Sequence, residues 1–177
     1  RLERETLRSA DRVIAVSAWL ARWAVDEAGC DPDRVRHVSN GTGATRPGDR
    51  TTTRERLGLD GLVLGFVGSF KPWHGIDRLV AMFKALADDP DYHLLVVGDG
   101  PERKRLNELR KEFPERVTLK GKVAHDEVPA LVRAIDVAVA PYPTLDHFYF
   151  SPLKVLEYMA CGCAVVASRI GQLNSLV

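Results

Sequence analysis

The chain has 177 residues and a formal net charge of +1, from 25 Lys and Arg against 24 Asp and Glu. This near-neutral balance excludes a protein that binds nucleic acid through bulk positive charge, and it excludes an acidic tail. Hydrophobic residues make up 45% of the chain, which supports a sizeable core, and no apolar run approaches the ~18 residues of a membrane span.

The first part of the chain is expected to form a small unit of its own. Residues 2–9 have a helical pattern, and residues 13–16 form a short apolar run typical of a buried strand. Ser17 is a plausible N-cap for the helix that follows. A second strand is expected over residues 35–39. Residues 41–60 are rich in Gly, Thr, Pro and charge, and we interpret them as a linker or domain boundary.

From residue 62 onward, strands and helices alternate regularly. The apolar runs are nearly continuous, which is typical of strands buried on both faces of a sheet. The strands are expected at 62–67, 94–97, 117–119, 135–140 and 164–167. The pattern predicts an α/β fold: a doubly wound parallel sheet with right-handed crossovers and helices on both faces. In such sheets, ligands bind beyond the carboxyl ends of the strands.

The loop after the first of these strands runs from Gly68 to Gly75 and leads into a helix. Glycine allows a ligand to approach the backbone closely, and free N–H groups at a helix start favour an anion. Lys71 and His74 add cationic or donor groups. The alternative is an ordinary turn in which Trp73 packs and Lys71 is solvated.

Other motifs argue against common cofactors. The loop Gly98-Asp99-Gly100 begins like a dinucleotide fingerprint, but Arg103 stands where a third glycine is needed. Two Asp-Pro-Asp segments precede strands and are interpreted as turns, so we expect no metal site. The three cysteines, at 30, 161 and 163, are too few for a disulfide framework and fit core thiols in a reducing compartment.

The most informative segment follows the fourth strand and reads Ser151-Pro152-Leu153-Lys154, with Glu157 three residues on. Ser151 is a natural N-cap and Pro152 a natural first helical residue. Leu153, Leu156 and Ala160 are expected to form the buried face. A lysine in a first helical turn has the wrong sign for the helix dipole unless an anion docks there. The alternative is a surface pair between Lys154 and Glu157.

Three stretches together resemble the retaining glycosyltransferases of family four. They are residues 10–17 with Val38-Ser39-Asn40-Gly41, residues 66–75, and residues 151–168. The resemblance implies the GT-B fold of two facing doubly wound domains. Residues 1–45 would be the end of the acceptor-side domain with the interdomain linker, and residues 46–177 a donor domain truncated at its C-terminus. We therefore expect a fragment of a longer enzyme that is inactive alone, with no catalytic residue assigned within it.

The resemblance also implies roles for single residues. Glu157 matches the carboxylate that holds the ribose hydroxyls. The backbone near Leu153 and Lys154 matches the diphosphate contact, and the loop that holds Lys122 and Val123 matches the one that lies against the base. Gly68, Ser151 and Pro152 complete the expected donor site.

The chain departs from the family pattern at three positions. Ser69 and His74 stand where an Arg and a Lys of the glycine loop usually grip the phosphates. Tyr149 stands at the first position of the Glu-x7-Glu pair, whose first Glu addresses the donor sugar. We expect Lys71 and Lys154 to replace the missing cations, and we interpret the changes as variation within the family.

The implied function is transfer of a sugar, with retention of configuration and without metal or cofactor, from a UDP-, GDP- or ADP-sugar. The acceptor would be a glycan, a lipid or a small molecule, as in polysaccharide biosynthesis. No nucleic-acid partner is expected. The parent protein would be cytoplasmic, with possible peripheral association at the inner face of the membrane. Two alternatives stay open: a non-catalytic nucleotide-binding module, and another GT-B protein such as a sugar-nucleotide epimerase.

Overall fold

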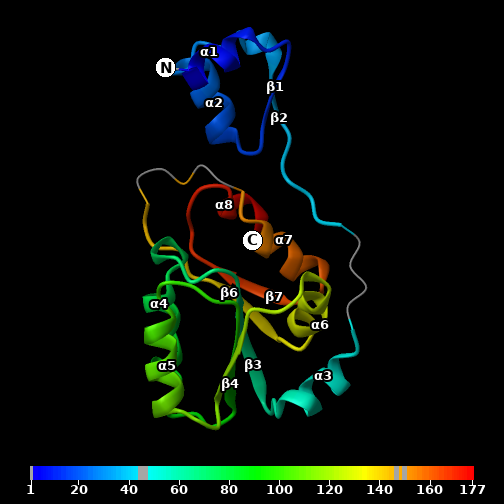
Figure 1. Cartoon of the computed structure of the whole chain (residues 1–177), viewed down its shortest axis with the longest axis vertical. Coiled ribbons are helices and arrows are strands. Elements are labelled where there is room, and N and C mark those ends of the chain that lie inside the picture. The colour runs from blue at the N-terminus through cyan, green and yellow to red at the C-terminus, as the bar shows by residue number, and fades with distance from the viewer. Residues whose placement is uncertain (1, 44–47, 146–147, 149–150) are drawn as a thin grey trace. The chain divides into compact units, whose positions relative to one another are not determined.

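The computed structural model describes residues 2–43, 48–145, 148 and 151–177 (Figure 1). The chain divides into two compact units. The first consists of Arg1–Gly41, Leu145–Leu153 and Arg169–Leu176, and the second of Thr42–Thr144 with Lys154–Ser168. The domain boundary expected between residues 45 and 46 stays a prediction.

The first unit contains two short parallel strands, three helices and a 3-10 turn among its described residues. Its elements are α1 (Leu2–Ser9), β1 (Val13–Ala15), α2 (Ala18–Asp26), the 3-10 turn η1 (Pro32–Arg34), β2 (Val35–His37) and α8 (Leu173–Leu176). The Ser17 hydroxyl accepts a hydrogen bond from the N–H of Leu20, which confirms the predicted N-cap of α2. Val13, Ala24 and Val35 are buried together in a small core.

The second unit is built on a five-stranded sheet in which every pairing is parallel. Its strands are β3 (Leu62–Val67), β4 (Tyr92–Val97), β5 (Val117–Gly121), β6 (Val137–Ala140) and β7 (Ala164–Ala167), in the order β5-β4-β3-β6-β7. The first and last of these strands have the bounds that the apolar runs predict.

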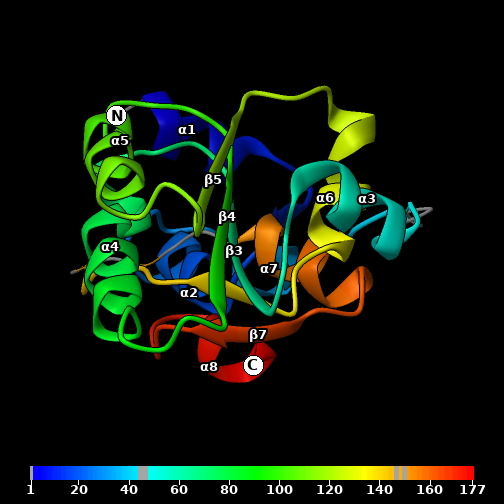
Figure 2. The same cartoon turned by 90° about the horizontal axis from the view of Figure 1, so that it is seen from below.

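Helices cover both faces of this sheet, which confirms the doubly wound fold (Figure 2). They are α3 (Arg50–Leu57), η2 (Pro72–His74), α4 (Ile76–Ala85), α5 (Arg103–Glu112), η3 (His125–Glu127), α6 (Val128–Arg133) and α7 (Leu153–Ala160). Alternate residues of β3 point to opposite faces. Leu64 and Phe66 pack with α4 and α5, whereas Val63 and Val67 pack with α6 and α7.

The interpretation of residues 41–60 as a linker is wrong for its second half, which forms α3. Asp49 caps this helix by accepting a hydrogen bond from the N–H of Thr52 at 2.6 Å, and Gly58 ends it in a left-handed conformation. The helix has no apolar stripe, so periodicity did not indicate it. Arg50 and Arg54 attach it to the sheet through the carboxylate of Asp136.

The predicted buried face of α7 is also wrong. Val155 and Tyr158 are fully buried, whereas Leu153 is 49% exposed, Leu156 is half-buried and Ala160 is exposed. A tyrosine can be buried at little cost when its hydroxyl finds partners, and that of Tyr158 bonds the backbone at the end of β3. The helix therefore turns its tyrosine, rather than its leucines, toward the sheet.

The neighbouring strands β3 and β6 separate toward their carboxyl ends. β3 pairs with β6 only through Leu64 and Gly65, while β6 pairs with β7 as far as Ala140. The chain runs from β3 outward through β4 and β5, then returns to the other side of β3 with β6. The point between β3 and β6 is therefore the topological switch point, where such sheets bind ligands.

Candidate functional site

A pocket lies at the carboxyl ends of β3 and β4. It is lined by residues at the ends of β3 and β4, in the loops after β3, β4 and β5, and at the start of α6: Val67, Gly68, Ser69, Val97, Gly98, Asp99, Lys122, Val123 and Val128. Four of these, Gly68, Ser69, Lys122 and Val123, are predicted site residues. The structure therefore brings the glycine loop and the loop after β5 together at one edge of the sheet.

Lys154 reaches the same edge from α7. Its ammonium nitrogen is buried and makes no hydrogen bond within the described residues. It lies 4.3 Å from the ring centre of Phe66 and 5.5 Å from that of Tyr142. No ion pair joins it to Glu157 in this part of the chain, so the pair considered as the alternative does not form. Burial lowers the pKa of Lys154 to about 7, against the opposing influence of Glu157.

The absence of a side chain at Gly68 makes room for this ammonium. A β-carbon built on Gly68 would lie 2.8 Å from the Lys154 nitrogen, and the φ of Gly68 is +149°. Residues with a β-carbon rarely adopt such a φ, so the backbone favours glycine at this position. The lysine is therefore held against the first residue of the glycine loop, within the site rather than on the surface of α7.

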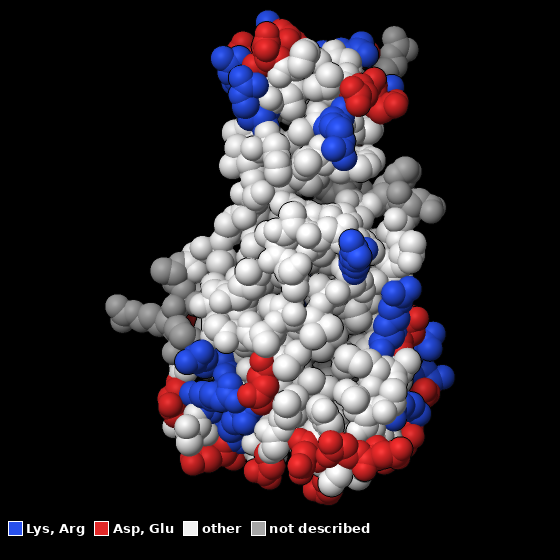
Figure 3. Space-filling model, turned by 180° about the vertical axis from the view of Figure 1, so that it is seen from behind, with Lys and Arg blue, Asp and Glu red and all other residues white. Residues whose placement is uncertain are grey.

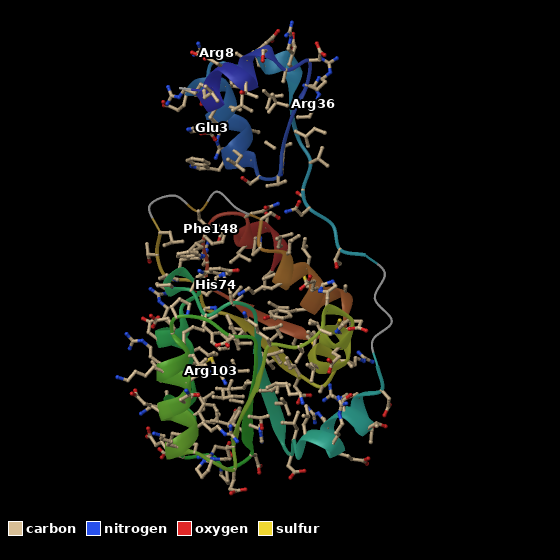
Figure 4. All side chains as sticks on the ribbon, viewed as in Figure 1. Glu3, Arg8, Arg36, His74, Arg103 and Phe148 are labelled. Atoms are coloured by element: carbon tan, nitrogen blue, oxygen red, sulfur yellow. The ribbon has the colours of Figure 1, made fainter. Side chains whose placement is uncertain are left out.

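His74 is the second predicted cationic residue at this edge (Figure 4). Its Nδ1 is in hydrogen-bond contact with the carbonyl oxygen of Ser69. A carbonyl only accepts, so Nδ1 carries the proton and the neutral ring offers Nε2 as an acceptor. Burial, followed by the charge of Lys154, lowers the pKa of His74, while the Ser69 carbonyl acts in the opposite direction. The ring lies edge-on to Tyr142, with centroids 5.9 Å apart.

Lys71 differs from Lys154 in its surroundings. Its side chain is exposed, and its ammonium lies 5.8 Å from the ring centre of Trp73, which is itself 47% exposed. Its charge contributes to the lowered pKa of His74, though less than that of Lys154. Of the two predicted replacement cations, the structure buries one and leaves the other at the surface.

The start of α7 differs from the sequence prediction. The helix begins at Leu153, so Pro152 precedes its first residue. Ser151 is buried, and its hydroxyl has no hydrogen-bond partner within the described residues, so it does not cap the helix as predicted. A serine two residues before the first helical residue is one position too early for the N-cap. Tyr149, at the position of the family's first Glu, lies outside the described residues.

Glu157 is half-buried on α7. Its carboxylate makes no hydrogen bond or ion pair in the described part of the chain. It is three residues from Lys154, so the two side chains lie on the same face of α7. Its role at the ribose stays a prediction.

Sequence reasoning missed Gly98, Asp99 and Val128 as pocket residues. The Asp99 carboxylate accepts a hydrogen bond from the N–H of Gly100 at 2.8 Å and pairs with Arg103 at 3.0 Å. The Gly100 N–H is the main cause that lowers the pKa of Asp99. The position of the loop is an indication of the site, because it follows β4, the neighbour of β3. Its sequence is not, because the loop fails as a dinucleotide fingerprint.

No helix within the described residues is both long enough and apolar enough to cross a membrane. Within the same residues, no group of three His, Cys, Asp or Glu side chains is placed to hold a metal ion. Acidic side chains gather at the end of the second unit where its strands begin (Figure 3). Asp60 and Asp91 flank these strand starts and are exposed. The candidate site lies at the opposite end of the strands.

Comparison with known proteins identifies relatives over the whole chain. Residues 61–177 match the family model described as glycosyl transferases group 1, and residues 1–46 match glycosyltransferase family 4. D-inositol 3-phosphate glycosyltransferases are similar over 99% of the chain, with 35% identity for that of Acidothermus cellulolyticus and 33% for that of Rhodococcus jostii. The chain spans 42% and 41% of their lengths.

Solved structures agree. Anabaena HepE, in complex with UDP and glucose, matches 100% of the chain and 50% of its own, with 28% identity and a TM-score of 0.76. Sucrose-phosphate synthase from Thermosynechococcus elongatus matches 98% of the chain and 44% of its own, with 30% identity and a TM-score of 0.74.

Proposed function

The chain belongs to the group 1 glycosyltransferases, and from this premise we propose that it forms the donor-binding part of an enzyme that uses a UDP-sugar. HepE, which is similar over the whole chain, has been solved with UDP and with UDP-glucose. We favour uridine over guanosine or adenosine on this ground. No observation on the described residues favours a non-catalytic module or an epimerase.

The observation that carries the proposal is the ammonium of Lys154. A buried cation without a hydrogen-bond partner is costly, and proteins keep such a group chiefly where a ligand supplies the missing charge. A diphosphate would supply it, and the free N–H groups at the start of α7 would add donors from the same side. Gly68 leaves the space through which the phosphate oxygens would reach the lysine.

His74 and Lys71 would complete the phosphate site in different ways. Because Nδ1 of His74 is committed to the Ser69 carbonyl, the ring donates to a phosphate through Nε2 only as a cation. A bound phosphate favours that cation by raising the pKa of the ring. Lys71, which is exposed, would contribute a long-range attraction that weakens with salt.

The nucleoside would occupy the pocket at β3 and β4. Lys122 and Val123 line it and would lie against the base, while Glu157 would accept hydrogen bonds from the ribose hydroxyls. The donor site would also include Ser69, Ser151, Pro152 and Leu153. The acceptor, a glycan, lipid or small molecule, would bind mainly through the part of the relatives that this chain does not span.

The finer description of the reaction is part of the proposal. Transfer would proceed with retention and without a metal or cofactor, as in family four. It would take place in the cytoplasm or at the inner face of the membrane, in the synthesis of a polysaccharide. Residues 1–45 would belong to the acceptor-side domain and residues 46–177 to the donor domain.

The test compares three ligands, UDP, UMP and uridine, by calorimetry. With Lys154→Met we expect UDP affinity to fall by about 10- to 100-fold, and uridine affinity to stay within about twofold. The matched control is Lys104→Met, because Lys104 is exposed on α5. Equal losses for UDP and uridine would mean that the lysine shapes the fold, and absence of UDP binding by the unmodified protein would refute the proposed donor.

A further inference from the structure

We propose that Tyr158 is a positioning residue for the phosphate site, because its hydroxyl replaces a neighbouring strand where β3 and β6 part and so fixes Lys154 over Gly68. The inference rests on the proposed function, since it concerns the same diphosphate. The inference goes beyond the proposed function, because it assigns the geometry of the phosphate site to a residue that would not contact the ligand.

The hydroxyl of Tyr158 makes two hydrogen bonds to one residue. It accepts from the N–H of Val67 at 2.8 Å and donates to the carbonyl oxygen of Val67 at 3.1 Å. A neighbouring strand would ordinarily bond such groups, but β6 pairs with β3 only through Leu64 and Gly65. The tyrosine therefore provides the hydrogen-bond partners of the Val67 backbone in place of a neighbouring strand. The crevice between β3 and β6 beyond Val67 stays open.

The same helix face carries Lys154. Residues four apart on a helix lie on one face, and the two side chains reach consecutive residues at the end of β3. Tyr158 bonds Val67, and the Lys154 ammonium lies against Gly68. The tyrosine thus fixes α7 at the height that places the lysine beside the glycine loop.

A tyrosine that only filled the core would behave differently on mutation. Its loss would lower stability and weaken every ligand equally, because the ring of Tyr158 is fully buried among residues from both β3 and β4. A positioning residue should instead affect the diphosphate selectively, and its effect should depend on Lys154 being present.

A double-mutant cycle tests this dependence. With Tyr158→Phe we expect UDP affinity to fall by about tenfold and uridine affinity by less than about twofold. In a Lys154→Met background, Tyr158→Phe should change UDP affinity by less than about twofold. Replacing Tyr158 with p-aminophenylalanine, which keeps a donor and an acceptor, should restore most of the affinity. Tyr92→Phe, at the opposite end of the sheet, is the matched control.

Hydrogen exchange gives a readout that needs no ligand. Tyr158→Phe should speed the exchange of amides in the Gly68–Gly75 loop and the first turn of α7, and leave the middle of β4 unchanged. Equal acceleration throughout the sheet, or UDP losses that add in the double mutant, would overturn the proposal. If the unmodified protein binds no UDP, the proposed function fails, and the exchange pattern alone decides the positioning role.

Discussion

The two ends of β3 each hold a partly or wholly buried charge, and they treat it in opposite ways. At the amino end, the Asp136 carboxylate pairs with Arg50 and Arg54 and accepts a hydrogen bond from the N–H of Val63 at 2.8 Å. At the carboxyl end, the Lys154 ammonium has aromatic rings beside it but no hydrogen-bond partner in the described residues. The fold satisfies the charge of Asp136, whereas it leaves the ammonium of Lys154 without a hydrogen-bond partner among the described residues, as expected of a charge that a ligand would complete.

The pKa values of Asp136 and Lys154 are both lowered, but for opposite reasons. Burial by itself would raise the pKa of Asp136, but the N–H of Val63 and the two arginines lower it, so the carboxylate is stabilised in its charged form. For Lys154, burial lowers the pKa and thus disfavours the charged form. The fold therefore favours ionisation at one end and opposes it at the other.

The largest expected effect concerns the amino end. Asp136→Asn should lower the free energy of unfolding by about 2–4 kcal/mol, because two arginines lose their counter-charge. UDP affinity should change by less than about twofold. Chemical denaturation and calorimetry check the two expectations, with the exposed Asp88→Asn as the control. A selective loss of UDP binding would contradict the separation of the two ends.

Glu157, on α7 with Lys154, is the carboxylate to compare with Asp136. Glu157→Gln should weaken UDP binding about tenfold, because the amide accepts through one oxygen only and without charge. Stability should hardly change, since no described residue forms a hydrogen bond or ion pair with this carboxylate. Titration with a uridine diphosphate that lacks both ribose hydroxyls should show equal affinity for the two proteins. A tenfold loss there as well would remove Glu157 from the ribose.

Lys154→Met should have opposite effects on binding and on stability. Removing a buried cation that has no hydrogen-bond partner among the described residues should raise the free energy of unfolding of the ligand-free protein by about 1 kcal/mol at pH 6, net of the lost aromatic contacts. Thermal denaturation without nucleotide checks the sign. A lower melting temperature for the variant would mean that the ammonium supports the fold, as Asp136 does.

The last prediction is a pH dependence of stability and of UDP binding. The pKa of Lys154 is about 7 in the folded chain and ~10.4 when unfolded. Between these values the unfolded chain binds more protons, so the free energy of unfolding should rise with pH, and below about pH 7 the full cost should remain. UDP affinity should fall over the same range as the ammonium loses its proton. In Lys154→Met, neither the free energy of unfolding nor the UDP affinity should show this pH dependence. If the variant keeps it, another group is responsible.

The sheet was the most predictable part of the molecule. β3 and β7 begin and end where their apolar runs do, because a strand buried on both faces needs apolar residues throughout. The sequence does not predict α3, because ion pairs rather than an apolar face hold this helix to the rest of its unit. Arg50 and Arg54 pair with the carboxylate of Asp136, which is more than 80 residues away in sequence, so no local pattern indicates the contact.

The site was predictable in its residues but not in its geometry. The loops after the strands indicated Gly68, His74 and Lys154, yet nothing in the sequence showed that the lysine is buried. Its surroundings combine Phe66 from β3, Tyr142 from the loop after β6, and the empty space at Gly68. The end of β3, the loop after β6 and helix α7 meet there, and only tertiary structure brings them together.

The close approach between Gly68 and Lys154 has a consequence for the history of the sequence. A β-carbon at position 68 would lie 2.8 Å from the ammonium nitrogen, which is the movable end of a flexible side chain, so the lysine rather than the backbone would have to shift. The positive φ of Gly68 favours glycine there whatever residue stands at position 154. Relatives with a lysine at position 154 are therefore expected to keep glycine at position 68, whereas glycine at position 68 does not require the lysine. The dependence between the two positions runs in one direction only, although they lie far apart in the chain.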